Sequence, residues 1–144
     1  MPNFQIFLIT ADNVLAGGAL KAFASAGFNS VLLRSCADFF AQGWRETGII
    51  FLDLACVGRD KPAELKTFFG KTHESSVIAM CDTAKTPSGE MVEILSSGVD
   101  DVISTSIDMS LLIAKTRAYI RRVEVRHIIK IERAAKKWCQ DSGA

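Results

Sequence analysis

A single carboxylate follows the most apolar stretch of the chain. In Gly48-Ile49-Ile50-Phe51-Leu52-Asp53-Leu54, four apolar residues in a row precede Asp53, and a segment containing Gly58 follows. A continuous apolar run of this kind is typical of a strand covered on both faces, as in a parallel sheet. Nothing inside such a sheet would pair a carboxylate, so we expect Asp53 where the strand ends. Ligands and chemistry gather at the carboxyl ends of strands in open α/β sheets, which makes Asp53 the first candidate for a functional residue.

The remaining segments alternate between strand-like and helix-like patterns, and they must position Asp53. Besides the Asp53 strand, strands are predicted at residues 4–9, 30–33, 77–81 and 99–104, and helices at 14–26, 36–42, 61–69, 88–97 and from 108 onward. Asp12 or Asn13 can cap the first helix, and Gly27 can end it. Five strand–helix repeats predict an α/β fold in which a parallel sheet carries helices on both faces.

Composition indicates an ordinary globular protein with an uneven charge distribution. The 144 residues fit one domain with a hydrophobic core, and 49% of them are hydrophobic against 23% charged. Residues 1–114 carry 8 Lys and Arg against 13 Asp and Glu, whereas residues 115–144 carry 9 against 3. The overall net charge of +1 therefore combines an acidic body with a basic tail.

Cysteine spacing and hydropathy restrict the compartment. Cys36, Cys56, Cys81 and Cys139 show neither CxxC spacing nor a nearby histidine pair, which favours free thiols in a reducing compartment over a zinc site. The N-terminus lacks the pattern of a signal peptide, and the apolar runs are too short to cross a membrane. We expect a cytoplasmic protein that does not enter the membrane.

With Asp53 ending the third strand of a five-fold βα pattern, residues 4–122 resemble the receiver domain of bacterial two-component response regulators. The similarity is carried by the strand that ends at Asp53, by Gly98-Val99-Asp100-Asp101, and by a fifth helix ending in Arg121-Arg122. It implies a flavodoxin-like, doubly wound sheet with strand order 2-1-3-4-5. It also implies that Asp53 would accept a phosphoryl group from a phosphohistidine on a sensor histidine kinase or phosphotransfer protein.

Other positions depart from the family pattern. The two adjacent acids that would hold Mg²⁺ fall at Thr10 and Ala11, and Asp12 stands one residue late, where it is a better helix cap than metal ligand. Asp12 and Asp53 alone would hold Mg²⁺ weakly. The resemblance places Cys81 and Thr105 where a hydroxyl residue and a lysine would contact the phosphoryl group, so these contacts are degenerate.

The aromatic switch position of the family falls at Val102. We therefore predict a pseudo-receiver that is weakly phosphorylated or not phosphorylated. The alternative is a phosphorylation-independent interaction module that acts through the fifth helix and the tail. An enzyme on the same fold is disfavoured, because Thr10-Ala11-Asp12-Asn13 lacks the glycines of a phosphate loop. Asp100-Asp101 are expected in a water-exposed turn.

The tail, residues 123–144, is predicted as a basic amphipathic helical extension of the receiver-like domain, residues 1–122. Apolar residues recur along its helix, for example Ile128, Ile131, Ala135 and Trp138, beyond what one sheet could cover. Pairing with a second copy, or with an output domain or partner protein, would bury this stripe. A nucleic-acid surface would rest on charge alone, and packing on the domain itself is a third reading.

Overall fold

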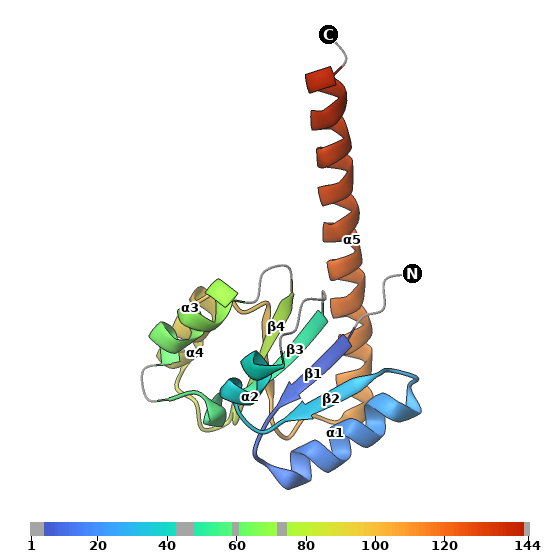
Figure 1. Cartoon of the computed structure of the whole chain (residues 1–144). Helices are drawn as coiled ribbons and strands as arrows, with labels where there is room; N and C mark the ends of the chain where they lie inside the picture. Colours follow the sequence, from blue (N-terminus) through green and yellow to red (C-terminus); the bar gives the residue numbers. More distant parts are fainter. Residues whose placement is uncertain (1–4, 43–47, 59–60, 72–74, 143–144) are drawn as a thin grey trace.

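Five parallel strands form one sheet in the order β2-β1-β3-β4-β5 (Figure 1). The structure is a computed structural model that describes residues 5–42, 48–58, 61–71 and 75–142. Its elements, in chain order, are β1 (Gln5–Ile9), α1 (Asn13–Ser25), β2 (Ser30–Leu33), α2 (Cys36–Ala41), β3 (Gly48–Asp53), the 3₁₀ turn η1 (Leu54–Cys56), α3 (Lys61–Lys71), β4 (Ser76–Cys81), α4 (Ser88–Ser96), β5 (Asp101–Ser104) and α5 (Met109–Ser142). The predicted flavodoxin-like fold and strand order are confirmed.

Local signals set the ends of the elements as predicted. The Asp12 carboxylate accepts hydrogen bonds from the backbone N–H groups of Val14 and Leu15 at 2.9 and 3.2 Å, and so caps α1. Gly27 and Gly98 follow α1 and α4 with φ of 84° and 116°, the left-handed region that glycine adopts without a steric penalty. Phe4, where the first strand is predicted to begin, lies outside the described residues.

Two apolar layers flank the sheet because strands buried on both faces need helices on both sides. Between the sheet and α1 and α5 lie residues such as Phe23, Phe51 and Leu112. On the other face, Phe39 of α2 stacks on Phe68 of α3, with ring centroids 5.5 Å apart. All six residues of β3 are buried, so Asp53 ends the central strand inside the fold.

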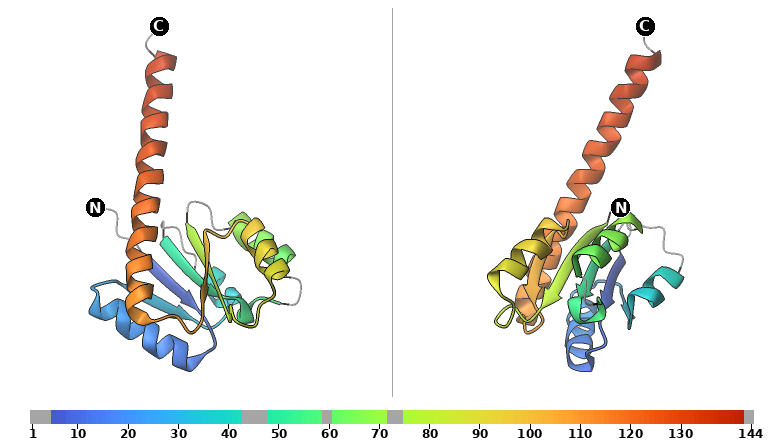
Figure 2. Two further views of the ribbon diagram at one scale, coloured as in Figure 1. Left: turned by 180° about the vertical axis from the view of Figure 1, so that it is seen from behind. Right: turned by 90° about the vertical axis from the view of Figure 1, so that its left-hand side faces the viewer.

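The helix α5 continues without a break far beyond the sheet. It runs opposite to the strands and projects from the edge where they begin, away from the end of β3 (Figure 2). Val123 is still buried in the core, whereas Ile128 and Ile131 are exposed. The projecting tail helix is therefore confirmed, and packing of these tail side chains on the domain is not what the structure shows. The division into residues 1–122 and 123–144 stays a prediction.

The expectation that Asp100 and Asp101 form a water-exposed turn is wrong for Asp101, whereas Asp100 does lie in an exposed bend before β5. Asp101 begins β5, and its carboxylate accepts a hydrogen bond from the Tyr119 hydroxyl at 2.5 Å and pairs with Lys115 at 3.3 Å. Asp100 accepts a hydrogen bond from the Val77 backbone N–H at 2.9 Å. Both carboxylates therefore join β5 to neighbouring elements and have structural roles.

Candidate functional site

Asp53 lies where the central strand leaves the sheet, and its carboxylate already has two donors. The Thr10 hydroxyl donates to Asp53 Oδ2 at 2.7 Å, and the Ala55 backbone N–H donates to Oδ1 at 3.0 Å. Thr10 is completely buried, and Asp53 is 6% exposed. Hydrogen bonds to a charged group in a buried setting are among the stronger ones in proteins. This pair therefore fixes the orientation of the carboxylate.

Thr10 is itself held by the strands around it. It follows β1, and its backbone N–H donates to the Leu33 carbonyl at 3.0 Å. Its hydroxyl oxygen accepts from the Asp12 backbone N–H at 3.1 Å while its proton points to Asp53. The neighbouring β1 and β3 strands are in parallel register up to Ile9 and Leu52, which brings the next residues together. The threonine thus belongs to one network with the carboxylate.

A hollow of about 360 Å³ opens beside Asp53. Its lining residues are Ala11, Asp12, Asp53, Leu54, Ala55, Cys81, Asp82, Thr86, Glu90, Ile94 and Thr105. All four candidate residues (Asp12, Asp53, Cys81 and Thr105) line this one hollow, as expected from the strand ends. The sequence patterns did not single out Asp82, which follows β4, or Glu90, which lies in α4. The predicted strand order places β4 beside β3, and this order indicates that residues just after β4 lie near Asp53.

The hollow is lined by acids and by no Lys or Arg among the described residues. Asp12, Asp53, Asp82 and Glu90 supply four carboxyl groups. Lys85 follows β4 and pairs with Asp82 at 3.8 Å, but its side chain is 86% exposed. The hollow therefore offers an incoming dianionic phosphoryl group several negative neighbours and no fixed cation.

The carboxylates of the hollow do not form a metal centre. Among the described residues, no group of three or more His, Cys, Asp or Glu side chains is placed to hold a metal ion. Asp12 Oδ1 is engaged as the cap of α1, and Asp53 is engaged by Thr10. Mg²⁺ requires near-octahedral oxygen ligation and usually one or two carboxylates that are free to bind it. The residues present therefore do not fit the Mg²⁺ site that the resemblance implies.

Two thiols, those of Cys36 and Cys56, line a second, more apolar cavity near the end of β3. Cys36 and Cys56 line a volume of about 230 Å³ together with side chains that include Phe40 and Phe68. Burial, with the nearby thiol of Cys56 and Glu64, raises the pKa of Cys36, and burial also raises the pKa of Cys56. All four cysteines are free. The raised pKa values keep the Cys36 and Cys56 thiols protonated near neutral pH, which argues against either of them as a nucleophile.

The comparisons with known proteins depend on the fold, because no protein-family model and no curated protein matches the sequence. A two-component response regulator from Clostridium difficile superposes with a TM-score of 0.71 at 19% identity, over 83% of this chain and 97% of that chain. A CheY-like response regulator receiver domain protein from Methanospirillum hungatei JF-1 gives 0.73 at 13% identity, over 85% and 98%. The chain has the receiver-domain fold.

A further structure resembles the tail as well as this receiver-type domain. The response regulator StyR superposes with a TM-score of 0.78 at 15% identity, and the match covers 97% of this chain and 70% of that chain. Because so little of this chain is left out, the match includes most of α5 beyond the sheet. In the described part of this chain, no helix is both long and apolar enough to cross a membrane.

Proposed function

We propose that the chain is an atypical receiver module of two-component phosphorelay signalling, with Asp53 at the phosphoacceptor position. Its partners would be a sensor histidine kinase or phosphotransfer protein and an output domain or partner protein, in the cytoplasm. We assign it a signalling role and no enzymatic one. One observation carries the proposal: Asp53 ends the central strand in a hollow that Asp12, Cys81 and Thr105 also line.

The surroundings of Asp53 favour weak phosphorylation or none. In a receiver, Mg²⁺ neutralises the incoming phosphoryl group, and a lysine pairs with its oxygens. Here the Thr10 hydroxyl occupies Asp53 Oδ2, and Thr105 stands at the lysine position. Acidic neighbours and the lack of a lining cation raise the cost of placing two negative charges on Asp53. The intact hydrogen bond between Thr10 and Asp53 would keep the unmodified state favoured.

Small-molecule phosphodonors test this proposal directly. The protein is incubated with acetyl phosphate and Mg²⁺, and intact-mass spectrometry reads the phosphoryl adduct. We expect little or no adduct on the wild type. The double variant Ala11→Asp, Thr105→Lys restores an acid and a cation on the lining of the hollow, and should gain adduct by at least about tenfold.

Adding Asp53→Asn to the double variant is the matched control, and it should abolish the adduct. Circular dichroism confirms that each variant is folded. Rapid, complete modification of wild-type Asp53 would contradict the atypical site. Failure of the double variant to gain adduct, or an adduct that persists without Asp53, would contradict the assignment of Asp53 as the acceptor position.

A second candidate function is supported by the exposed apolar residues of α5. Ile128, Ile131, Ala135 and Trp138 recur at alternating spacings of three and four residues, the pattern of a two-stranded coiled-coil seam. Ile128 is 55% exposed, Ile131 56% and Trp138 70%. We propose that a second copy of the chain pairs along this seam, whether or not Asp53 is modified.

Light scattering coupled to size exclusion measures this pairing on the full-length chain. Ile131→Glu should shift the mass from dimer to monomer, because it places a charge in the apolar seam. Lys137→Glu also introduces a glutamate, but on another face of α5, and it should leave the dimer intact. Asp53→Ala should leave the dimer intact as well. A wild type that is monomeric at all concentrations tested would remove the second candidate.

A further inference from the structure

A groove of about 770 Å³ runs along α5 at the edge where the strands begin, at the opposite end of the sheet from Asp53. It is lined by Asp100, Ala118, Arg121, Arg122, Val125 and Arg126. The five α5 residues recur every three or four positions, so they share one side of the helix. We call this surface the arginine groove. It is distinct from the Asp53 hollow in position and in charge.

The three arginines of the groove differ in how they are held. Arg126 pairs with Asp100 at 3.6 Å and donates a hydrogen bond to the Ser76 hydroxyl at 2.6 Å, so the chain holds it in place. The Arg122 guanidinium lies over the Tyr119 ring, 5.9 Å from its centroid. Among the described residues, no carboxylate forms an ion pair with Arg121 or Arg122. Two exposed guanidinium groups are therefore available to an outside anion.

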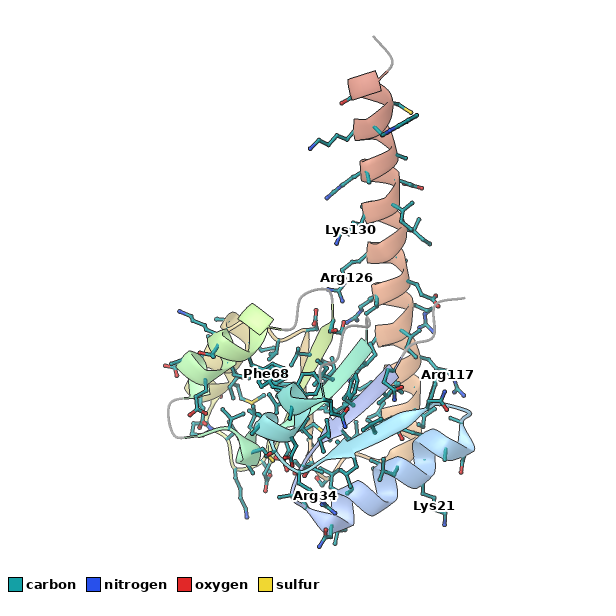
Figure 3. The ribbon with its side chains drawn as sticks, in the orientation of Figure 1. Lys21, Arg34, Phe68, Arg117, Arg126 and Lys130 are labelled. Carbon is teal, nitrogen blue, oxygen red and sulfur yellow. The ribbon has the colours of Figure 1, made fainter. Side chains whose placement is uncertain are left out.

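The groove combines this positive charge with apolar surface. Ala118 and Val125 lie between the arginines, and Val125 is 54% exposed. Ile129, four residues further along the same side of α5, is 41% exposed. Figure 3 shows Arg126 and Lys130 projecting from one side of α5, and Arg117 pointing to the other, where it contacts Phe28. Basic groups thus flank an apolar strip.

The coiled-coil seam occupies a different side of the helix. At about 100° per residue, Ile131 lies about 120° and 160° around the helix axis from Val125 and Ile129, and Ile128 lies about 60° and 100° from them, so the seam is centred on a different side. Two copies that pair along the seam would leave the Ala118, Arg122 and Val125 side of each arginine groove open, with Arg121 at the border between the two surfaces. The groove is therefore a separate surface that needs its own partner.

We propose that the arginine groove docks an acidic amphipathic helix of a partner protein. Carboxylates of such a helix would pair with Arg121 and Arg122, and its apolar residues would cover Ala118, Val125 and Ile129. A second copy of α5 that packed groove against groove is a poor occupant, because Arg121 and Arg122 of the two copies would face one another. Nucleic acid is also a poor occupant, because its phosphates would pair with the arginines but would leave the apolar strip of the groove uncovered.

This inference extends the proposed interaction function and does not require phosphoryl transfer to Asp53. It names the chemistry of a partner and the place where that partner binds. Arg126 links the groove to the sheet, since its guanidinium contacts Asp100 beside β5 and Ser76 in β4. Partner carboxylates would compete with Asp100 for Arg126. Binding in the groove would therefore alter the contacts of Arg126 with Asp100 and Ser76 at the edge of the sheet.

A designed peptide provides the probe. It has about 18 residues, or five helical turns, with leucines three and four residues apart and glutamates elsewhere, and it carries a fluorophore. A control peptide has the same composition with its leucines dispersed around the helix. Fluorescence anisotropy measures the affinity of full-length wild type for both peptides at one ionic strength. We expect the patterned peptide to bind at least about tenfold more tightly.

Two charge-reversal pairs on the same helix separate the groove from general charge. Arg121→Glu with Arg122→Glu should weaken binding of the patterned peptide by at least about tenfold. Lys136→Glu with Lys137→Glu makes the same change in charge beyond the groove, and should change affinity by less than about threefold. Circular dichroism checks folding, and light scattering on the same variants checks that the α5 seam still pairs.

Three results would overturn the proposal. One is the absence of binding of the patterned peptide to the wild type, or equal binding of the dispersed control. Another is equal loss of affinity in the two charge-reversal pairs. The last is a DNA duplex that binds more tightly than the peptide and depends on Arg121 and Arg122. Because self-association depends on Ile131 and phosphorylation on Asp53, neither of those proposed functions falls with this one.

Discussion

Replacing Thr10 by valine removes the hydroxyl that holds Asp53 and keeps nearly the same volume. The hydrogen bond from Thr10 to the Asp53 carboxylate is 2.7 Å long and buried, and bonds of that kind contribute about 1.5–3 kcal/mol. The Asp12 backbone N–H also loses its acceptor, at about 0.5–1 kcal/mol. We expect Thr10→Val to lower the free energy of unfolding by about 2–4 kcal/mol.

Urea denaturation followed by circular dichroism measures this loss, with an unchanged slope showing that the unfolded state is comparable. A double-mutant cycle with Asp53→Asn isolates the pair. The asparagine amide oxygen still accepts from Thr10, but a neutral hydrogen bond is about half as strong. We expect a coupling energy of about 1 kcal/mol between the two substitutions.

Thr67→Val is the matched control, because the exposed Thr67 hydroxyl donates only to the Ala63 carbonyl within α3. Its effect should stay within about 0.5 kcal/mol. If Thr10→Val were as mild as this control, or cost the same in the Asp53→Asn background, the hydroxyl would not hold the carboxylate. The account of Asp53 as pre-engaged would then be refuted.

The other predictions concern the packing of the sheet. Burial acts to raise the pKa of Asp101, but the hydrogen bonds from Tyr119, the Val102 N–H and Lys115 together outweigh it, so that pKa is lowered. Burial and the Asp101 carboxylate raise the pKa of Tyr119. The stability that the Asp101 carboxylate adds is therefore present above its unfolded pKa, and it is lost as pH falls through its folded pKa. The stability that the Tyr119 hydroxyl adds is present at lower pH, and it is lost as pH rises above about 10. Tyr119→Phe should cost about 1 kcal/mol between pH 5 and 9, with the gap to wild type closing at both extremes in urea titrations; a gap independent of pH would contradict the pairing. Gly48→Ala should destabilise by about 1–3 kcal/mol in thermal melts, because the new Cβ would lie 2.5 Å from the Gln5 carbonyl oxygen. Gly17→Ala has open space around its Cβ and should stabilise α1 by about 0.5–1 kcal/mol, so a loss in that variant would indicate an unseen contact.

Much of the fold follows from local patterns in the sequence. Burial on both faces explains why β3 is a continuous apolar run, and it places Asp53 at the strand end without further information. The caps at Asp12 and Gly27 depend on neighbours only a few residues away, so they are visible in the sequence. The strand order was carried by the family resemblance, which then predicted that Cys81 and Thr105 would come to one hollow.

Contacts between distant segments were harder to predict. In the sequence, Thr10 stands at a position where the family pattern has an acid. Only the parallel register of β1 and β3 places its hydroxyl where it donates a hydrogen bond to the Asp53 carboxylate. Asp101 follows Gly98 and reads as part of a turn, whereas its partner Tyr119 lies a helix away in the sequence. Side chains that join elements far apart in the chain leave no periodic signal, and their partners depend on tertiary packing.

The uninterrupted course of α5 has a mechanical consequence. From Arg126, which contacts Ser76 of the sheet, the helix continues to Ser142, a length of about 24 Å. A stiff rod pivoting at its base by about 10° would swing its far end by about 4 Å, somewhat less than the spacing of about 5–6 Å between neighbouring side chains on a helix. Any adjustment at Asp100 or Ser76 would thus be magnified along the rod, and the far end of α5 would change position without the sheet itself rearranging.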